Sequence, residues 1–291
     1  MQNSKYLVAN SRDAQWGLTV SCVGYEEVET WEEYPTKGHA DGYYFDINKG
    51  RKLSEYQLLY LSEGEGVFQS AHIPETTIKA GDMFLLFPGE WHTYHPAEGK
   101  VWKSYWIGFK GKNVDDRVKA GFLTSEHPIY HVRFSSDIIN LYEQALKTAV
   151  EEEAYHQQTL AGIVNHLIGL MYSLQRNIIL NKNQNHVEVI SKARMRIRET
   201  LEEEVTIQQI AEEMGISYSN FRKLFKEFTG IAPSMYQQDL RLQRAKELLS
   251  ATNLSIKEIA YRLNFESPDY FSSKFKIKTG MRPSDFRSKM R

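Results

Sequence analysis

Residues 206–237 are TIQQIAEEMGISYSNFRKLFKEFTGIAPSMYQ, and residues 255–287 are SIKEIAYRLNFESPDYFSSKFKIKTGMRPSDFR. The two segments align at an offset of 49 residues, which becomes 50 after one insertion near Asp269. Ten aligned positions are identical, whereas average residue usage predicts about two by chance. The C-terminal third of the chain therefore contains a duplicated unit.

Each copy predicts a helix, a turn and a second helix. Thr206 and Ser255 are suited to cap the first helix of their copies, and Gly215 to end it in the first copy. The second helices carry phenylalanines at i and i+4 and end at a glycine. Between the copies, residues 235–250 have leucines at helical spacing and predict a connecting helix.

The outward face of each second helix is polar and basic. Such side chains near a helix N-terminus can reach base edges in the major groove, while flanking lysines hold phosphates. The alternative is a solvated surface that binds nothing. The candidate DNA-binding residues are Ser217, Tyr218, Ser219, Asn220, Arg222, Lys223 and Lys226 in the first copy, and Ser267, Pro268, Asp269, Ser272, Ser273, Lys274 and Lys276 in the second.

The net charge of −1 conceals a division between the two ends of the chain. Residues 1–186 hold 17 basic and 23 acidic residues, whereas residues 187–291 hold 19 basic and 14 acidic ones. The excess is largest in residues 217–291, with 15 basic against 7 acidic residues. A basic C-terminal domain is typical of proteins that bind polyanions such as DNA.

Length and composition limit the remaining possibilities. A chain of 291 residues with 41% hydrophobic and 25% charged residues predicts two globular domains rather than disorder. The single cysteine, Cys22, excludes an intramolecular disulfide and a cysteine-based zinc site. The N-terminus does not resemble a secretory signal, and no apolar run approaches the ~20 residues of a membrane span. We therefore expect a cytoplasmic protein without a membrane partner.

The first third of the chain shows short β-type runs separated by glycine-containing turns. This pattern predicts a small barrel or jelly roll. The predicted strands are residues 43–47, 56–61, 66–70, 83–87 and 101–109. Residues 138–174 then show apolar residues three and four apart, which predicts amphipathic helices that cover the barrel, pair with a second copy, or both.

The duplicated unit resembles the paired helix-turn-helix domain of AraC-type transcription regulators, and the likeness includes Arg241, Leu242, Ala245 and Leu249 of the connecting helix. The resemblance implies two recognition helices in successive major-groove segments, a homodimer and contact with RNA polymerase. Arg241 joins the candidate DNA-binding residues on this ground. By position, the resemblance places Arg222, Lys223, Ser272 and Ser273 among base-contacting residues. Ser273 departs from the long basic or amide side chain that is frequent there.

Three segments resemble the cupin-like effector domain that precedes the DNA-binding domain in many of these regulators. They are LLYLSEGEGVF at 58–68, IKAGDMFLLFPGEWHTYHP at 78–96 and VWKSYWIGFKG at 101–111. In the sugar-responsive branch, an Arg, a Tyr and a Trp line the pocket at places that Arg51, Tyr94 and Trp106 resemble. Ser104 stands where a ligand-contacting His can occur.

Aromatic faces and polar side chains at strand ends suit a small polar ligand such as a sugar. Packing in the core is the alternative for about half of these aromatic residues. The candidate effector-binding residues are His39, Tyr43, Arg51, Trp91, His92, Tyr94, Ser104 and Trp106.

A cupin metalloenzyme, such as an isomerase or a dioxygenase, fused to a nucleic-acid-binding module is the alternative function. A cupin metal site needs two close histidines on one strand, a Glu, and a third His on a later strand. No H-x-H precedes His92, and His72 stands alone. We therefore expect no metal, no cofactor and no catalytic residue.

Together these features predict an α+β multidomain protein. We expect a cupin-like effector domain in residues 1–112, a helical dimerisation segment in 113–175, a linker in 176–187 and an all-α DNA-binding domain in 188–291. The predicted function is ligand-responsive, sequence-specific regulation of transcription at double-stranded promoter DNA, with activation of carbohydrate-utilisation genes by a small sugar. A constitutive architectural DNA-binding protein with an empty barrel is a third hypothesis.

Overall fold

The structure, a computed structural model, describes residues 2–29, 34–35, 45–180 and 184–290. These residues form two compact units, Met1–Ile179 and Leu180–Arg291, and each is described by itself. The division falls inside residues 176–187, where the linker is predicted. Helix occupies most of that segment, because α4 continues to Leu180 and α5 begins at Gln184.

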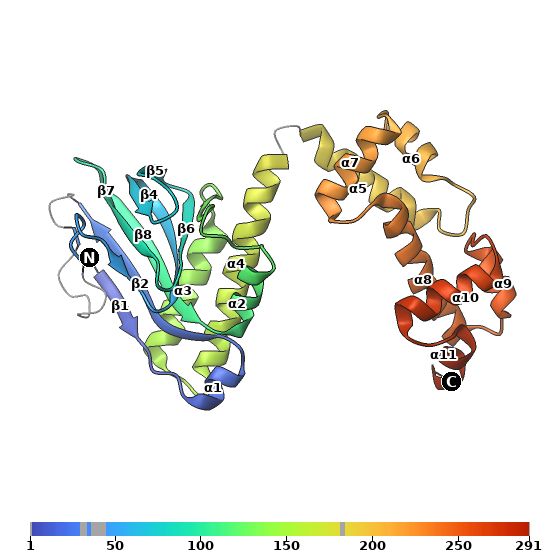
Figure 1. Cartoon of the computed structure of the whole chain (residues 1–291), viewed down its shortest axis with the longest axis horizontal. Coiled ribbons are helices and arrows are strands. Elements are labelled where there is room, and N and C mark those ends of the chain that lie inside the picture. The colour runs from blue at the N-terminus through green and yellow to red at the C-terminus, as the bar shows by residue number, and fades with distance from the viewer. Residues whose placement is uncertain (1, 30–33, 36–44, 181–183, 291) are drawn as a thin grey trace. The chain divides into compact units, whose positions relative to one another are not determined.

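The first unit contains the strands of a bent, two-sheet barrel (Figure 1). One sheet has the order β1-β2-β8-β4-β6-β9, and the second joins β3, β5 and β7 to the far end of β4. All the recorded pairings are antiparallel. The strands are β1 (Gln2–Tyr6), β2 (Thr19–Val28), β3 (Arg51–Lys52), β4 (Tyr56–Ser70), β5 (Thr76–Lys79), β6 (Asp82–Leu86), β7 (Trp91–Pro96), β8 (Trp102–Lys110) and β9 (Ile129–His131).

Strand β4 passes from one sheet to the other and forms the corner of the barrel. Its first part pairs with β6 and β8, its second part pairs with β5 and β7, and the register with β8 shifts between Leu61 and Glu63. Gly64 lies at this corner with a φ of 100°, and a Cβ atom there would lie 1.8 Å from the Val101 carbonyl oxygen. Only glycine fits such a close approach.

The larger sheet is buried on both faces. Leu58 and Tyr60 of β4 belong to an apolar cluster shared with the helices, whereas Leu59 and Leu61 belong to the cluster inside the barrel. This alternation is the two-residue period of a strand. It explains why β4 begins with six buried residues in succession.

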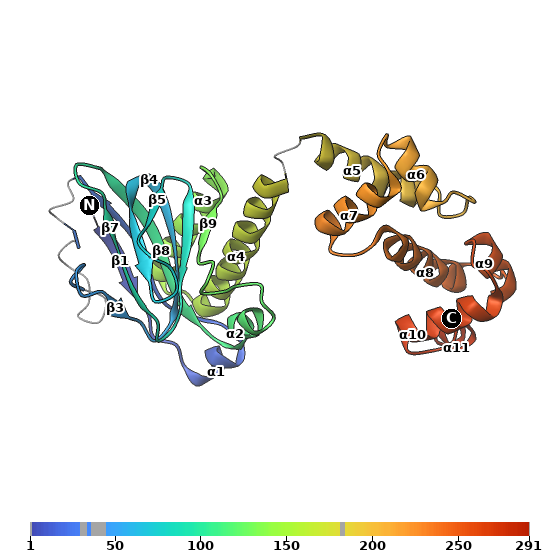
Figure 2. The ribbon, with the colours of Figure 1, turned by 45° about the horizontal axis from the view of Figure 1, so that its top comes forward.

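Helices cover the outer face of this sheet. Figures 1 and 2 both show α3 and α4 packed along it. The apolar residues of these helices join the cluster that contains Leu58 and Tyr60. The helices of the first unit are α1 (Ser11–Gln15), α2 (Lys112–Lys119), α3 (Ser136–Glu151) and α4 (His156–Leu180).

The second unit consists of two helix-turn-helix motifs joined by α8, as the repeat predicts. Thr206, Ser217, Ser255 and Ser267 each accept a backbone N–H at the start of the next helix. Gly230, and Gly280 in the second copy, end the recognition helices in the left-handed conformation. The helices are α5 (Gln184–Glu199), α6 (Ile207–Glu213), α7 (Tyr218–Thr229), α8 (Pro233–Ala251), α9 (Ile256–Arg262), α10 (Pro268–Thr279) and α11 (Pro283–Met290).

Two expectations about strands were wrong in detail, and one long strand was not predicted. Residues 56–61 and 66–70 belong to one strand, because the glycines between them form a corner rather than a hairpin turn. The described part of the predicted strand 43–47 ends in a turn. Strand β2 was not predicted, because burial on both faces removes the alternation of apolar and polar residues.

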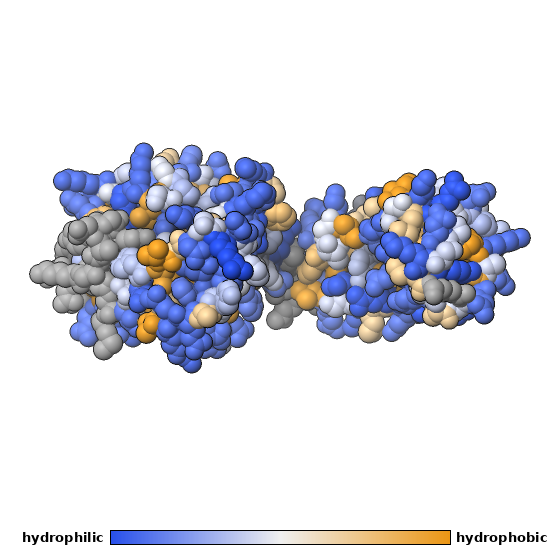
Figure 3. Space-filling model, turned by 90° about the horizontal axis from the view of Figure 1, so that it is seen from below, coloured by the Kyte–Doolittle hydropathy of each residue, from blue (hydrophilic) through white to orange (hydrophobic). Residues whose placement is uncertain are grey.

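None of the described helices is both long enough and apolar enough to cross a membrane. The visible face of each unit in Figure 3 is mostly hydrophilic with scattered apolar residues.

One side chain of α4 completes the hydrogen bonding of β2. The Gln157 amide oxygen accepts the Val20 N–H at 2.9 Å, and its Nε2 donates to the Val20 carbonyl at 2.9 Å. Both residues are buried. Gln157→Ala would leave two buried backbone groups without partners, so we expect a loss of roughly 2–4 kcal/mol in the free energy of unfolding of the first unit.

Urea unfolding followed by tryptophan fluorescence measures this loss, because all five tryptophans lie between residues 16 and 106. Gln158→Ala is the matched control, since Gln158 donates to the half-buried Asp13 carboxylate rather than to a buried backbone group, so it should cost less than Gln157→Ala. Equal losses for the two variants would contradict the role given to Gln157.

Candidate effector pocket and candidate nucleic-acid interface

A small pocket lies inside the barrel and is lined by strands from both sheets. It receives side chains from β2, β3, β4, β7 and β8 and from the described residues between β2 and β3. Its lining residues are Glu26, Tyr34, Pro35, Phe45, Arg51, Gln57, Tyr94 and Trp106.

Arg51 organises the polar side of this pocket. Its Nη2 donates to the Tyr94 hydroxyl at 2.9 Å and to Gln57 Oε1 at 3.3 Å, and its Nε donates to His92 Nε2 at 3.3 Å. The Phe45 ring centroid lies 4.5 Å from the centre of the guanidinium, which is a cation–π contact. These four contacts of the guanidinium are to neutral groups and an aromatic face.

Glu26 brings a carboxylate to the same pocket, although its side chain is only 3% exposed. The Ser104 hydroxyl donates to Glu26 Oε1 at 3.4 Å, and the Trp102 indole N–H donates to Ser104 at 2.8 Å. Ser104 therefore lies behind Glu26 rather than in the lining. Among the described lining residues, the pocket therefore has one half-buried basic side chain, Arg51, and one buried acidic side chain, Glu26.

Aromatic rings fill most of the remaining space. The Tyr94 ring centroid lies 5.4 Å from that of Phe45 and 6.2 Å from that of Tyr34. Burial raises the pKa of Tyr34 well above its ordinary value, and burial also raises that of Tyr94 against the opposing charge of Arg51. The free volume is about 10 Å³, enough for about one water molecule.

The structure brings together three of the candidate effector-binding residues, Arg51, Tyr94 and Trp106. His92 touches this group through Arg51, while Trp91 turns outward and donates its indole N–H to the Lys49 carbonyl at 2.7 Å. His39 and Tyr43 lie outside the described residues.

Five residues of the pocket were not predicted from the sequence. They are Glu26, Tyr34, Pro35, Phe45 and Gln57. Glu26 lies on β2, which was not recognised as a strand, and Gln57 lies in an apolar run where a single amide is the only signal. Tyr34 and Phe45 have no local pattern that marks them.

The described histidines of the first unit do not form a cluster that could hold a metal ion. The His72 ring nitrogen lies 3.4 Å from Glu90 Oε1, and that of His131 lies 2.7 Å from Asp82 Oδ1. In the part of the chain that the structure describes, no group of three or more His, Cys, Asp and Glu side chains is arranged to hold a metal ion.

The second unit presents the outward faces of α7 and α10. Arg222, Lys223 and Lys226 are exposed on α7, and Ser273 and Lys276 are exposed on α10. The opposite face of α7 buries Phe221, Leu224 and Phe225, and that of α10 buries Phe271 and Phe275. Each helix is therefore held by one face and leaves the other in solvent, as major-groove contact requires.

Two aromatic residues pack beside basic side chains on these helices. The guanidinium of Arg222 lies 5.7 Å from the Tyr218 ring centroid, and the ammonium of Lys274 lies 5.3 Å from that of Tyr270. Both pairs are four residues apart, so they lie on one side of their helix.

A groove of about 530 Å³ runs beside α10. The candidate residues Asp269, Ser272, Ser273 and Lys276 line it. Four residues that were not among the candidates line it too: Ile256, Arg282, Pro283 and Ser284. The repeat contained the signal for Ser284, because Ser234 occupies the same position in the first copy.

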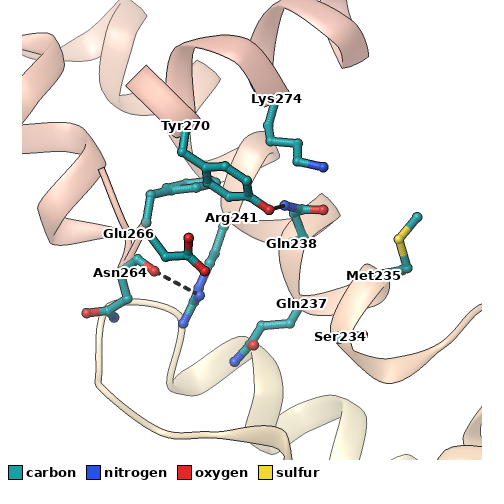
Figure 4. A pocket seen from close by; sticks show the side chains of 10 residues that line it. Ser234, Met235, Gln237, Gln238, Arg241, Asn264, Glu266, Tyr270 and Lys274 are labelled. Atoms are coloured by element: carbon teal, nitrogen blue, oxygen red, sulfur yellow. Dashed lines mark hydrogen bonds between the residues drawn. The ribbon is translucent and has the colours of Figure 1, made fainter. Parts of the chain in front are cut away.

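Arg241 occupies a different environment from the other candidate DNA-binding residues. It is partly buried, and its Nη1 donates to the Asn264 carbonyl at 3.1 Å. Burial lowers the pKa of its guanidinium. Arg241, Tyr270 and Lys274 line a hollow of about 390 Å³ between α8 and α10. Figure 4 shows these side chains. The structure thus gives Arg241 a contact inside the protein, and its contact with DNA stays a prediction.

Comparison with known sequences covers both units. Residues 31–194, more than half of the chain, match the family described as the AraC-like ligand binding domain. Residues 173–289 match the family described as a helix-turn-helix domain.

Three curated relatives align over most of their own length. The raffinose operon transcriptional regulatory protein RafR of Pediococcus pentosaceus is 26% identical, over 82% of this chain and 87% of the relative. The lactose operon transcription activator of Staphylococcus xylosus is 28% identical, with the same two coverages. The arabinose operon regulatory protein of Escherichia coli K12 is 26% identical, over 86% of each chain.

The environment of His92 generates a prediction about pH. Burial, and then the charge of Arg51, lower the pKa of His92 from 6.5 to about 3. The unfolded chain binds a proton below about pH 6.5, whereas the folded chain does not bind it until about pH 3. The stability from this neutral His is therefore complete above pH 6.5 and is lost as the pH falls toward 3.

We expect the first unit to lose about 2 kcal/mol through His92 between pH 7 and pH 5, since each pKa unit is worth about 1.4 kcal/mol. Urea unfolding followed by tryptophan fluorescence at both pH values measures this loss. His92→Gln should remove that part of the pH dependence. A variant that loses as much stability as the original chain on acidification would contradict the assignment.

Proposed function

This chain belongs to the AraC family of DNA-binding transcription regulators, and we propose that it activates carbohydrate-utilisation genes in response to a small, neutral sugar. It has a ligand-binding domain followed by a helix-turn-helix domain, and the matched relatives are regulators, not enzymes. The metalloenzyme alternative is therefore not supported. Activation and a sugar effector are inferred from relatives named for raffinose, lactose and arabinose operons.

The observation that carries the sugar proposal is the lining of the barrel pocket. Tyr94 and Trp106 offer aromatic faces, while Arg51 and Gln57 offer hydrogen-bonding groups beside them. Sugars are held by stacking of C–H groups on aromatic rings and by hydrogen bonds to hydroxyls. This combination of side chains supports a polyhydroxylated ligand better than an apolar one.

The charges of the pocket favour a neutral sugar over a uronic acid. Glu26 and Arg51 both line the pocket, so their charges balance. An acidic ligand would place a second negative charge close to the buried Glu26 carboxylate, where repulsion is poorly screened. A carboxylate only accepts hydrogen bonds at neutral pH, and vicinal hydroxyls can donate to both of its oxygens.

Binding has to displace side chains that now fill the pocket. A free volume of about 10 Å³ does not hold a sugar ring, and the Phe45 ring occupies the face of Arg51 that a ligand would use. Ligand binding then favours a state in which Phe45 has left the guanidinium. A ligand shifts such an equilibrium by its differential affinity for the two states.

The outward faces of α7 and α10 are the proposed DNA-reading surfaces. Arg222 and Lys223 on α7, and Ser272 and Ser273 on α10, are the proposed base-contacting residues. Lys226 and Lys276 occupy the same place in the two copies and are proposed to bind phosphates. A homodimer formed through the helices of residues 113–175 and contact with RNA polymerase stay predictions from the family resemblance.

A thermal-shift screen tests the sensor proposal. The full chain is heated with neutral pentoses, hexoses and small oligosaccharides, each beside its uronic acid where one exists, and tryptophan fluorescence follows the first unit. One neutral sugar should raise the melting temperature, as ligand binding to the folded state requires. Its uronic acid should not.

Two variants test sugar binding and the preference for a neutral sugar separately. Arg51→Ala should abolish the shift, and Glu26→Gln should narrow the gap between the neutral sugar and its uronic acid. No shift with any compound would instead support the architectural DNA-binding hypothesis. A larger shift with the uronic acid would overturn the charge argument alone.

DNA binding is tested with duplexes selected from a random library by the full chain. Arg222→Ala should reduce discrimination at one base pair by about 1–3 kcal/mol, because a base contact is lost. Lys276→Ala should weaken binding to all duplexes alike and lower the slope of log K against log salt by about 1.

Lys192→Ala removes the same charge from α5, outside the candidate residues, and serves as the control. A chain that shows no preference for any selected duplex over random DNA at moderate salt would refute sequence-specific regulation. Identical specificity profiles for the Arg222 and Lys276 variants would refute the separate roles given to them.

A further inference from the structure

The two helix-turn-helix motifs have separate apolar cores. Among the described residues, α5, α6 and α7 share one cluster, while α9, α10 and the C-terminal half of α8 share another. Tyr236 and Leu240 of α8 pack on the first core, and Leu242 is the first α8 residue in the second. Apolar packing therefore holds the helices of each motif together, and α8 connects the two motifs (Figure 2).

A polar loop of the first motif reaches the second motif. Glu202, between α5 and α6, accepts from Arg244 Nε of α8 at 3.1 Å through one carboxylate oxygen. Its other oxygen accepts from Arg262 Nε of α9 at 2.7 Å. These hydrogen bonds lower the pKa of Glu202, with the larger effect from Arg262. One carboxylate thus joins the first motif to the connecting helix and to the second motif.

Asn264 makes a second connection from the turn between α9 and α10. Its side-chain Nδ2 donates to the Glu203 carbonyl at 2.8 Å and to the Leu201 carbonyl at 3.4 Å. Its own carbonyl accepts from Arg241, as Figure 4 shows. Asn264 has a φ of 54°, a left-handed conformation that asparagine tolerates better than most residues.

We infer that these contacts form a spacing clasp, composed of Glu202, Arg244, Arg262 and Asn264, that holds the two recognition helices at one separation. Its function is to make the protein specific for the distance between the two DNA segments that α7 and α10 contact. The clasp residues are positioning residues, since the inference gives them no contact with a base. The inference rests on DNA binding by this family and is independent of the sugar proposal.

Because DNA is helical, a small change in the relative position of the two motifs changes which DNA spacing they can contact. One base pair inserted between two sites moves one of them by about 3.4 Å along the duplex and rotates it by about 34°. A flexible joint between the motifs would accommodate such a change, whereas a fixed joint would not. The clasp acts across the boundary between the two cores, where no shared apolar cluster resists rotation among the described residues.

The clasp side chains are suited to mutation without loss of the fold. The Glu202 and Arg262 side chains are 33% and 47% exposed, and neither belongs to an apolar core. Exposed ion pairs contribute little to stability. Glu202→Gln keeps the side-chain shape but removes its charge, and Asn264→Gly keeps the left-handed backbone but removes the donor amide.

The experiment uses the full chain and one selected duplex that contains both contacted segments. Two further duplexes carry one base pair more or one base pair fewer between the segments. The measured quantity is the ratio of Kd on the altered duplexes to Kd on the parent duplex. Glu247→Gln is the matched control, because Glu247 also pairs with Arg244, at 2.8 Å, but lies on the same helix.

We expect Glu202→Gln and Asn264→Gly each to lower this ratio about 3- to 10-fold, which lies within the range of coupling between residues in one network. Glu247→Gln should leave the ratio unchanged. A general loss of stability would weaken binding to all three duplexes alike and would not change the ratio. Unchanged ratios for both clasp variants, with the fold intact, would show that α8 alone sets the spacing and would overturn the inference.

Discussion

The proposed DNA-reading surface depends on two pairs of buried phenylalanine rings. Phe221 and Phe225 lie one helical turn apart with ring centroids 5.5 Å apart, and Phe271 and Phe275 repeat the arrangement at 5.7 Å. All four are fully buried. Because this pattern commits one face of each helix to a core, the polar and basic residues between the phenylalanines have to face outward. The exposed surface that suits DNA is thus a consequence of how the helices are held.

The two helix-turn-helix motifs and the helix between them could be predicted, because their signals are local, whereas α5 and α11 were not predicted. Capping residues, the i and i+4 phenylalanines and the terminal glycines lie within a few residues of the helices they define, and the duplication repeats each signal. The contacts of the clasp could not be predicted in this way. Glu202 and Arg262 are 60 residues apart, and an acidic residue in a loop has many possible basic partners. Arg241 shows the same limit, since resemblance suggested DNA contact but could not reveal its bond to the Asn264 carbonyl.

The barrel was predicted as a class, but not strand by strand. Cys22 belongs to the cluster inside the barrel and Val23 to the cluster beneath the helices, so β2 has no polar face to mark it. Glycines that resemble a hairpin turn instead bend β4 between two sheets. The pocket residues were likewise predicted only in part. Resemblance identified Arg51 and Tyr94, whereas Glu26 was hidden in the strand that alternation could not detect.

The closed pocket sets a limit on how an effector can act. The guanidinium of Arg51 already has an aromatic ring over it and three neutral hydrogen-bond acceptors, so a ligand gains only the difference between its own contacts and those it replaces. Replacing these contacts lowers the net affinity for the ligand. The same replacement is the structural difference between the bound state and the free state. A pocket that is already open would bind the ligand more tightly. Binding would then cause no change at the contact between Phe45 and Arg51. If the proposed sugar alters DNA affinity by some factor, linkage requires DNA to alter sugar affinity by the same factor. Weak effector binding and strong regulation are therefore compatible in this fold.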